Sequence, residues 1–155
     1  MIVRLRYLTG ADAERLCALW GGDDPLPGYR IPGNEEETDR LIAEWSRGEA
    51  NGARFFMLLI EADGSPAGLV SLYERAEGLS LGISVHLSCQ RRGIGRQAVG
   101  LAAEFARAGG YRTLISQCRD DHEASIALHK KCGFERTGKR VNSKGRTVLC
   151  WRMEL

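Results

Sequence analysis

Hydrophobic and polar positions alternate over residues 2–8, which is the pattern of a half-buried β-strand. A helical spacing follows, and its apolar face consists of Ala13, Leu16, Cys17 and Trp20. Thr9 is the expected N-cap of this helix, and Gly21–Gly22 ends it. Residues 21–33 hold three prolines and four glycines. We expect them to form a long loop of the kind that often carries function.

A second helix is predicted after this loop. Asn34 and Glu37 form a variant of the capping box, and the apolar stripe that follows is Leu41, Ile42 and Trp45. Three apolar runs come next, at residues 54–61, 67–75 and 79–87. Asp63–Gly64 and Glu77–Gly78 separate them with turn signals, so we expect an antiparallel meander of three strands.

The last third of the chain alternates helices and strands. We predict a helix over residues 94–108, a strand over 111–118, and a helix from about 120–122 to about 132 that Gly133 terminates. A hairpin over residues 141–155 turns around residues 142–145. The whole order predicts a single α+β domain over residues 1–155 with a mainly antiparallel sheet.

Charge and composition exclude several classes of function. The net charge is only +2, so no global field favours nucleic acid. None of the five cysteines belongs to a C-x-x-C pair, and we expect a reduced protein without a metal site. No apolar run approaches the length of a membrane span, and no signal peptide is evident. A cytoplasmic protein without a membrane or nucleic-acid partner fits these observations.

Residues 90–96, with the sequence QRRGIGR, are the strongest candidate for a binding site. They follow a predicted strand and open a predicted helix. Glycines 93 and 95 let the backbone approach a ligand, and the first amides of a helix are free donors that favour negative charge. Three arginines add positive charge: Arg91, Arg92 and Arg96. We therefore expect a phosphorylated ligand, and specifically a pyrophosphate, at residues 91–96.

Residues 93–98 also match G-x-G-x-x-[G/A], the dinucleotide-binding pattern. Asp120, at the end of the next strand, stands where a ribose-binding acid could lie. The context is against this reading, because the pattern should follow the first strand of a βαβαβ half-domain. Here it follows an antiparallel meander, and the residues that remain are too few for such a domain.

Two segments resemble the GCN5-related N-acetyltransferase (GNAT) superfamily. Residues 90–95 match its acetyl-CoA loop, [Q/R]-x-x-G-x-[G/A], and residues 122–134 resemble its later segment N-x-x-[A/S]-x-x-L-[Y/H]-x-x-x-G-F. The order of the elements also agrees over essentially the whole chain. The resemblance implies the GNAT fold: a mixed, mainly antiparallel central sheet flanked by about four helices, with a splayed strand pair at the acetyl-CoA site.

Two positions depart from the family pattern. His122 stands where the family has an asparagine that contacts CoA, and His129 stands in place of the usual tyrosine beside the cofactor sulfur. The run Ser125-Ile126-x-Leu128-His129 is similar to the branch of phosphinothricin and methionine-sulfone acetyltransferases. We interpret this branch as the nearest in motif.

The resemblance implies transfer of an acetyl group from acetyl-CoA, as co-substrate, directly to a primary amine. The free edge at residues 84–87 would pair with the pantetheine arm, and an amide near Val85 would stabilise the oxyanion. His122 would either contact CoA or simply lie in solvent beside the N-cap of its helix, and His129 would pack against CoA. The implied cofactor-binding residues are Val85, Leu87, Gln90, Arg91, Arg92, Gly93, Ile94, Gly95, Arg96, His122 and His129.

For proton transfer, His129 is the candidate acid, since histidine donates a proton near neutral pH. Glu74 and His86 are the candidate bases, either of them through a water. No base is needed if the amine arrives partly neutral. Cys89 and Cys132 flank the motifs, but no histidine pairs with them in the sequence, so a covalent acyl-cysteine is disfavoured.

The resemblance implies an acceptor pocket walled by the loop 21–33, the second helix and the final hairpin. The loop and the start of the second helix carry acidic residues that either suit a cationic amine or simply form a solvated face. They are Asp23, Asp24, Glu35, Glu36 and Glu37. Tyr29 and Trp45 either line the pocket or belong to the core. A small-molecule amine is the expected partner, with a possible homodimer. A protein N-acetyltransferase and a non-catalytic acyl-CoA-binding module are the alternatives.

Overall fold

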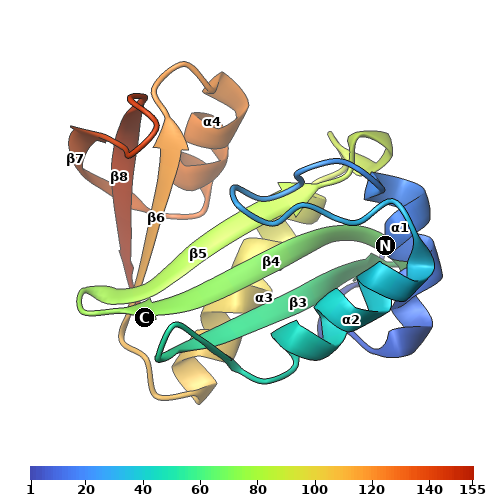
Figure 1. The fold of residues 1–155 in the computed structure, drawn as a ribbon. Coiled ribbons are helices and arrows are strands. Elements are labelled where there is room, and N and C mark those ends of the chain that lie inside the picture. The colour runs from blue at the N-terminus through green and yellow to red at the C-terminus, as the bar shows by residue number, and fades with distance from the viewer.

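Eight strands form one mixed sheet with helices on both faces in the computed structural model, which describes all 155 residues (Figure 1). The strand order is β1-β3-β4-β5-β6-β8-β7, and the short β2 pairs with β3. The elements are β1 (Val3–Tyr7), η1 (Gly10–Asp12), α1 (Ala13–Trp20), α2 (Glu35–Trp45), β2 (Glu49–Ala50), β3 (Ala53–Ala62), β4 (Ser65–Arg75), β5 (Gly78–Val85), η2 (Leu87–Cys89), α3 (Ile94–Ala108), β6 (Thr113–Arg119), α4 (Glu123–Lys131), β7 (Glu135–Val141) and β8 (Thr147–Glu154).

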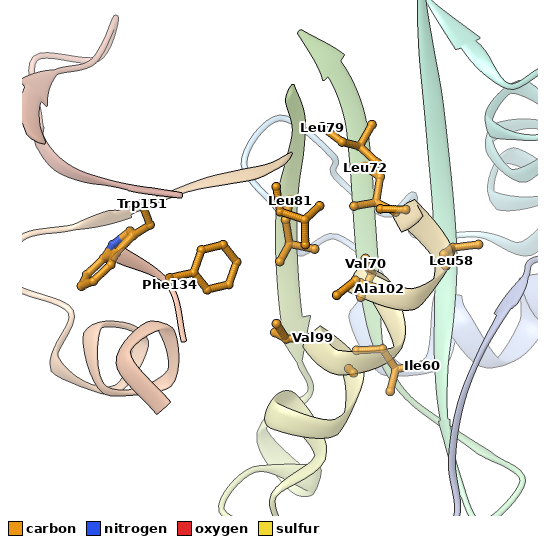
Figure 2. Packing of buried hydrophobic residues seen from close by; sticks show 14 of the residues in the cluster. Leu58, Ile60, Val70, Leu72, Leu79, Leu81, Val99, Ala102, Phe134 and Trp151 are labelled. Carbon is orange, nitrogen blue, oxygen red and sulfur yellow. The ribbon is translucent and has the colours of Figure 1, made fainter. Parts of the chain in front are cut away.

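The central strands β3 and β4 are buried on both faces. Residues Leu58, Ile60, Val70 and Leu72 pack toward α3 (Figure 2), whereas Phe55, Met57, Leu59 and Leu69 pack toward α1 and α2. Successive side chains of a strand point to opposite faces, so a strand covered on both sides needs apolar residues at every position. The run at residues 54–61 is continuously apolar because both faces of β3 are buried.

Strands β5 and β6 separate soon after they meet. They pair in parallel only at Leu79–Leu81 with Leu114–Ser116. All the other strand pairs are antiparallel. Beyond this short contact the strands diverge, and α4 with β6, β7 and β8 stands apart from the main body of the sheet (Figure 1). Phe134 and Trp151 fill the space beside the fork (Figure 2). The predicted GNAT fold with its splayed strand pair is confirmed.

The predicted helix over residues 94–108 is confirmed at both ends, and Asn34 caps α2 by accepting a hydrogen bond from the Glu37 amide. Several strand boundaries differ, and two of the differences have a clear cause. β5 ends at Val85 instead of continuing to residue 87, because the chain turns into the 3₁₀ helix η2. β7 begins at Glu135 rather than 141, since its side chains are exposed on both faces and show no apolar alternation. No helix of the structure is both long enough and apolar enough to cross a membrane.

Candidate active site

The loop before α3 presents three free backbone amides at a helix N-terminus. Arg91 and Gly93 have positive φ angles of 63° and 77°, so the backbone reverses twice within three residues. The first helical donor is the Gln97 amide, which bonds to the Gly93 carbonyl at 3.3 Å. The amides of residues 94–96 find no acceptor in the protein, and no side chain caps them. The helix dipole and the exposed arginines therefore make this end of α3, which we call the anion site, favourable for negative charge.

Gln90 ties this loop to the end of β5. Its side-chain amide Nε2 donates to the Val85 carbonyl oxygen at 3.0 Å. The hydrogen bond satisfies a carbonyl that would otherwise be left free where the strand ends. The glutamine of the acetyl-CoA loop motif thus shapes the loop in this chain.

The edge of β5 that faces β6 is free beyond Leu81. The His86 amide donates to the Ala67 carbonyl of β4 at 2.8 Å. Because the backbone groups of a strand alternate in direction, Ser84 also faces β4, whereas Ile83 and Val85 point away from it. Two amides, Ile83 and Val85, are therefore available to a ligand strand. Sequence reasoning chose Val85 and missed Ile83, although the two-residue period could have indicated it.

Leu87 does not continue this edge. It begins η2, and its side chain is 81 % exposed. The prediction that Leu87 would pair with the pantetheine arm as a strand residue is therefore wrong, because the chain has already turned at His86.

A narrow apolar crevice runs between the free edge of β5 and the helices α3 and α4. Its lining residues are Leu81, Ile83, Val99, Leu128, His129, Cys132 and Phe134. Gly95 lies beside one of these lining residues, since a Cβ there would be 3.5 Å from Leu128 and 3.7 Å from Val85. The crevice thus lies beside the fork between β5 and β6, and His129 supplies its polar ring.

His129 is buried at the fork, with an exposed fraction of only 4 %. Its Nδ1 lies 2.7 Å from the Ser125 carbonyl oxygen, and its Nε2 lies 2.8 Å from the Ser116 hydroxyl. The ring stacks on Trp151 at 5.0 Å between centroids. Burial lowers its pKa below the usual value, against a smaller opposite effect of the hydrogen bond to Ser125. The ring is therefore neutral near pH 7, with both nitrogens occupied.

His122 is the N-cap of α4. Its Nδ1 accepts a hydrogen bond from the Ser125 amide at 3.0 Å, and the residue is exposed. A helix-capping asparagine uses its side-chain oxygen in the same way. His122 thus caps α4 as an asparagine could, and its exposure leaves Nε2 toward solvent.

His86, a predicted base, has both ring nitrogens engaged. Nδ1 accepts from the Ser88 amide at 3.2 Å, so Nε2 carries the proton and donates to the Leu19 carbonyl oxygen at 3.2 Å. The ring also packs edge-on against Trp20. This histidine fastens the end of β5 to α1, which leaves no free nitrogen for proton abstraction.

Glu74, the other predicted base, lies at the wrong end of β4. Its carboxylate accepts a hydrogen bond from the Tyr111 hydroxyl at 2.7 Å. Val85 pairs with Gly68, six residues away along the same strand. At roughly 3.3 Å per residue the separation is about 20 Å. The position does not fit a general base for chemistry at the free edge.

The loop 21–33 covers the opposite face of β4 and β5. Leu26 is 1 % exposed and reaches Gly82 of β5, while Tyr29 stacks on Phe55 at 5.5 Å. Trp45 packs in the same cluster. Tyr29 and Trp45 are therefore part of the core rather than the lining of an open pocket, and burial raises the pKa of Tyr29. The acidic side chains of the loop and of the first turn of α2 are exposed.

Comparisons with known proteins agree with this geometry. Residues 3–135 match the acetyltransferase (GNAT) domain family. The chain is 33% identical over 144 residues to N-alpha-acetyltransferase RimI of Mycobacterium tuberculosis, which covers 89% of this chain and 82% of that protein. It is 30% identical over 152 residues to aminoglycoside N(6')-acetyltransferase type 1 of Stenotrophomonas maltophilia, over 88% of this chain and 89% of that protein.

Among solved structures, spermidine N-acetyltransferase of Vibrio cholerae in complex with CoA and spermine shares the fold. Its TM-score is 0.77 at 18% identity, over 98% of this chain and 95% of that one. The matched family covers β5, α3 and α4, which line the crevice together with Phe134. The chain belongs to the GNAT family of N-acetyltransferases.

Proposed function

We propose that this protein transfers the acetyl group of acetyl-CoA directly to a primary amine of a small molecule. The observation that carries the proposal is the continuity between two features: the free edge of β5 at Ile83 and Val85 leads, through Gln90, straight into the anion site at residues 94–96. One extended ligand with a pyrophosphate at one end and an amide-containing arm at the other fits both.

The residues fit CoA in three respects. The free amides of residues 94–96 and the arginines around them suit the pyrophosphate. The backbone groups of Ile83 and Val85 suit the amides of the pantetheine arm, as an added strand would. The apolar side chains of the crevice suit the aliphatic end of the arm, which would have to part them, because the crevice is too narrow here for a water molecule. When bound, acetyl-CoA supplies an activated acyl group as a thioester.

The chain contributes electrostatic stabilisation at the free edge. An amide that already points at the thioester oxygen stabilises the negative charge that develops there, and Ile83 and Val85 are the two candidates. Both lie where a bound arm would exclude water. No side chain near them is free to act as a base, so the amine loses its proton to water in this proposal.

We assign His129 to the wall of the crevice and leave protonation of the departing thiolate to solvent. Its neutral ring, held by Ser116 and Ser125, has no extra proton to give near pH 7. A covalent acyl-cysteine is also disfavoured. Burial raises the pKa of the Cys132 thiol, so this cysteine remains protonated and weakly nucleophilic.

For the acceptor, we favour a small amine. The relatives are named for aminoglycosides and for protein α-amines. The exposed carboxylates beside the loop 21–33 favour an approaching cation. The likeness of residues 125–129 to the phosphinothricin branch keeps amino-acid-like amines within the proposal. A protein α-amine is the second candidate, because RimI is 33% identical to this chain.

The test is release of CoA thiol from acetyl-CoA against a panel of acceptors, with mass spectrometry of the product. The panel holds amino acids, methionine sulfone, phosphinothricin, polyamines, aminoglycosides and short peptides. Turnover on one class of small amine, with kcat/KM at least tenfold above that for peptides, supports the proposal. Preference for peptides replaces it with protein N-acetylation. Tight acetyl-CoA binding without turnover on any acceptor indicates a non-catalytic binding module.

A further inference from the structure

We infer that the free edge of β7 is a docking surface for an acidic, extended segment of a partner protein. β7 is the last strand of the sheet, and β8 and β6 separate it from the fork with β5 (Figure 1). Neighbouring strands lie about 4.8 Å apart, so β7 is roughly 10 Å beyond β6. The surface is therefore separate from the proposed acetyl-CoA site, and its role goes beyond acetyl transfer.

Positive charge is concentrated in the part of the chain that ends the sheet. Residues 112–155 hold ten lysines and arginines against five aspartates and glutamates, whereas residues 1–111 hold 12 against 15. The two parts thus differ in sign, although the net charge of the whole chain is only +2. An anionic partner that approaches the end of the sheet meets a local positive field that the total charge conceals.

The basic side chains of this edge have no acidic partners. β7 and its turn into β8 carry five of them, all exposed: Arg136, Lys139, Arg140, Lys144 and Arg146. The ion pairs of the structure involve other arginines. Glu135 is the only acidic residue over residues 135–146. The positive charge of this edge is therefore available to a partner.

β7 also offers backbone groups that no neighbouring strand uses. The Asn142 amide donates to the Arg146 carbonyl oxygen at 2.8 Å, so the backbone groups of Asn142 face β8. Because this direction alternates along an antiparallel strand, Arg140 also faces β8, whereas Lys139 and Val141 direct their N–H and C=O groups away from it. An extended segment can pair with these outward groups as an added strand.

The turn from β7 into β8 holds this edge in place before a partner binds. Asn142 Oδ1 accepts hydrogen bonds from the Lys144 and Arg146 amides, each at 3.0 Å. The Gly145 amide donates to the Asn142 carbonyl oxygen, also at 3.0 Å, and Gly145 takes a positive φ of 76°. Since a preorganised edge has little freedom to lose, less of the binding free energy is spent on ordering it.

The charge and shape of the edge decide which partner fits. A second copy of β7 would bring like charges together, which is a device by which natural edge strands avoid self-association. Nucleic acid would match the charge, but single strands also bind by stacking on aromatic side chains, and residues 135–147 contain none. The side chain of Val141 is 65 % exposed and suits an apolar side chain on a paired polypeptide strand. An acidic polypeptide strand therefore fits best.

The experiment titrates full-length protein into fluorescein-labelled peptides and follows fluorescence anisotropy at 50 mM NaCl. The probe is an eight-residue peptide that alternates glutamate with valine. A second peptide has the same sequence and charge, with a methyl group on every backbone amide nitrogen. We expect the second peptide to bind at least tenfold more weakly, because it cannot donate the hydrogen bonds of an added strand.

The variant Lys139→Gln/Arg140→Gln removes two positive charges from the edge. It should raise the Kd of the glutamate–valine peptide about three- to thirtyfold, since each exposed ion pair contributes modestly. Arg4→Gln/Arg107→Gln is the matched control, because it removes the same charge from exposed arginines of β1 and α3. Its peptide Kd should stay within about twofold of the wild-type value. Both variants should bind CoA as the wild type does.

The outcomes separate docking from acetyl transfer. The inference is overturned by absence of peptide binding, by equal peptide Kd values in the wild type and the β7 variant, or by full binding of the methylated peptide. Tighter binding of an eight-nucleotide thymidine oligonucleotide than of the peptide would replace the protein partner with nucleic acid. The proposed function stands or falls separately, by release of CoA thiol in the wild type.

Discussion

The Ser116 hydroxyl lies 2.8 Å from Nε2 of His129, at the point where β5 and β6 part. It also lies 3.2 Å from the Leu81 carbonyl oxygen. Since the Ser125 carbonyl can only accept, Nδ1 of His129 carries a proton, and in the neutral ring Nε2 accepts from Ser116. Protonation of the ring would turn this hydroxyl toward Leu81. The Ser116 hydroxyl therefore links the protonation state of His129 in α4 to the fork between β5 and β6.

The buried histidine makes stability depend on pH. Its pKa is lower in the folded protein than in the unfolded chain, so the unfolded chain binds the extra proton first as the pH falls below about 6.5. The free energy of unfolding should therefore decrease from pH 7.5 to pH 5.5. In His129→Phe, which keeps an aromatic ring beside Trp151, the decrease should be smaller. Urea denaturation of both proteins at several pH values measures this difference.

The same variant tests the assignment of His129 to the crevice wall. General acid catalysis contributes about 10²–10⁴-fold. If His129 only packs, kcat of His129→Phe at pH 7.5 should stay within about tenfold of the wild type, because no proton-transfer step of that size is removed. A loss of a hundredfold or more, with a changed pH profile, would restore the histidine as the acid.

Gly95 should matter for CoA and not for folding. An added Cβ would make ordinary contacts with Leu128 and Val85, and the residue has no positive φ angle. It would nevertheless narrow the space beside the crevice. We expect Gly95→Ala to keep its free energy of unfolding within about 1 kcal/mol, or gain from helix propensity. Crowding of about 1–3 kcal/mol should weaken CoA binding roughly five- to hundredfold.

Gly93→Ala is the informative comparison for Gly95→Ala. Gly93 has a φ of 77° with open space around its Cβ position, so the change strains the backbone without filling a groove. Its cost should appear as about 1–2 kcal/mol of lost stability in chemical denaturation. CoA binding in Gly95→Ala that equals the wild-type value would show that Gly95 has no special place beside the crevice.

Glu74→Gln should leave acetyl transfer essentially unchanged. Glu74 lies about 20 Å along β4 from the residue opposite Val85, and its partner is the Tyr111 hydroxyl. Glutamine keeps an acceptor for this hydroxyl. Steady-state kinetics across pH 6–9 should give the wild-type profile. Loss of the basic limb of the profile would return Glu74 to the list of bases.

The sequence predicted the fold and the helix that follows the glycine loop better than the contacts of the catalytic candidates, for a physical reason. The glycines, the arginines and the helix pattern at residues 90–108 act locally, so their spacing in the chain decides their structure. The roles of the three catalytic candidates depend on hydrogen bonds to residues distant in sequence. These pairs are His86 with Leu19, Glu74 with Tyr111, and His129 with Ser116. No periodicity reports such partners, and each engaged side chain looked free in the sequence.

The boundary of β5 shows the same limit. The apolar run 79–87 includes Leu87, so alternation alone extends the strand too far. The turn at His86 depends on its bonds to Ser88 and Leu19, and the latter lies 67 residues away. The exposed strand β7 was missed in part for a related reason, since pairing with β8 rather than burial maintains it.

We expect His86 to have a structural role and no catalytic one. Two substitutions at this position can distinguish the two roles. His86→Ala removes the cap of η2 and the link to Leu19, and should cost about 0.5–2 kcal/mol of stability. In His86→Asn the side-chain oxygen can still cap the Ser88 amide, so part of this loss should be recovered. Thermal denaturation measures both. The pH dependence of kcat/KM should be alike in the two variants, and a basic limb lost in both would instead identify His86 as the base.

The arginines around the anion site should make CoA binding sensitive to salt. Arg92 and Arg96 are exposed and flank the free amides, so their attraction to the pyrophosphate is screened by ions. The double variant Arg92→Gln/Arg96→Gln should bind CoA about ten- to hundredfold more weakly at low salt, since charged hydrogen bonds contribute about 1.5–3 kcal/mol before screening. The Kd of the double variant should also change less than that of the wild type between 20 and 300 mM NaCl, as measured by isothermal titration calorimetry.

Arg107→Gln serves as the control for the double variant, because Arg107 is an exposed arginine in the last turn of the same helix. It changes the net charge of α3 without touching the loop, so its Kd and salt dependence should equal those of the wild type. The backbone amides of residues 94–96 remain in every variant, and binding should therefore weaken rather than vanish. A double variant that keeps both the affinity and the salt dependence of the wild type would place the pyrophosphate away from the N-terminus of α3.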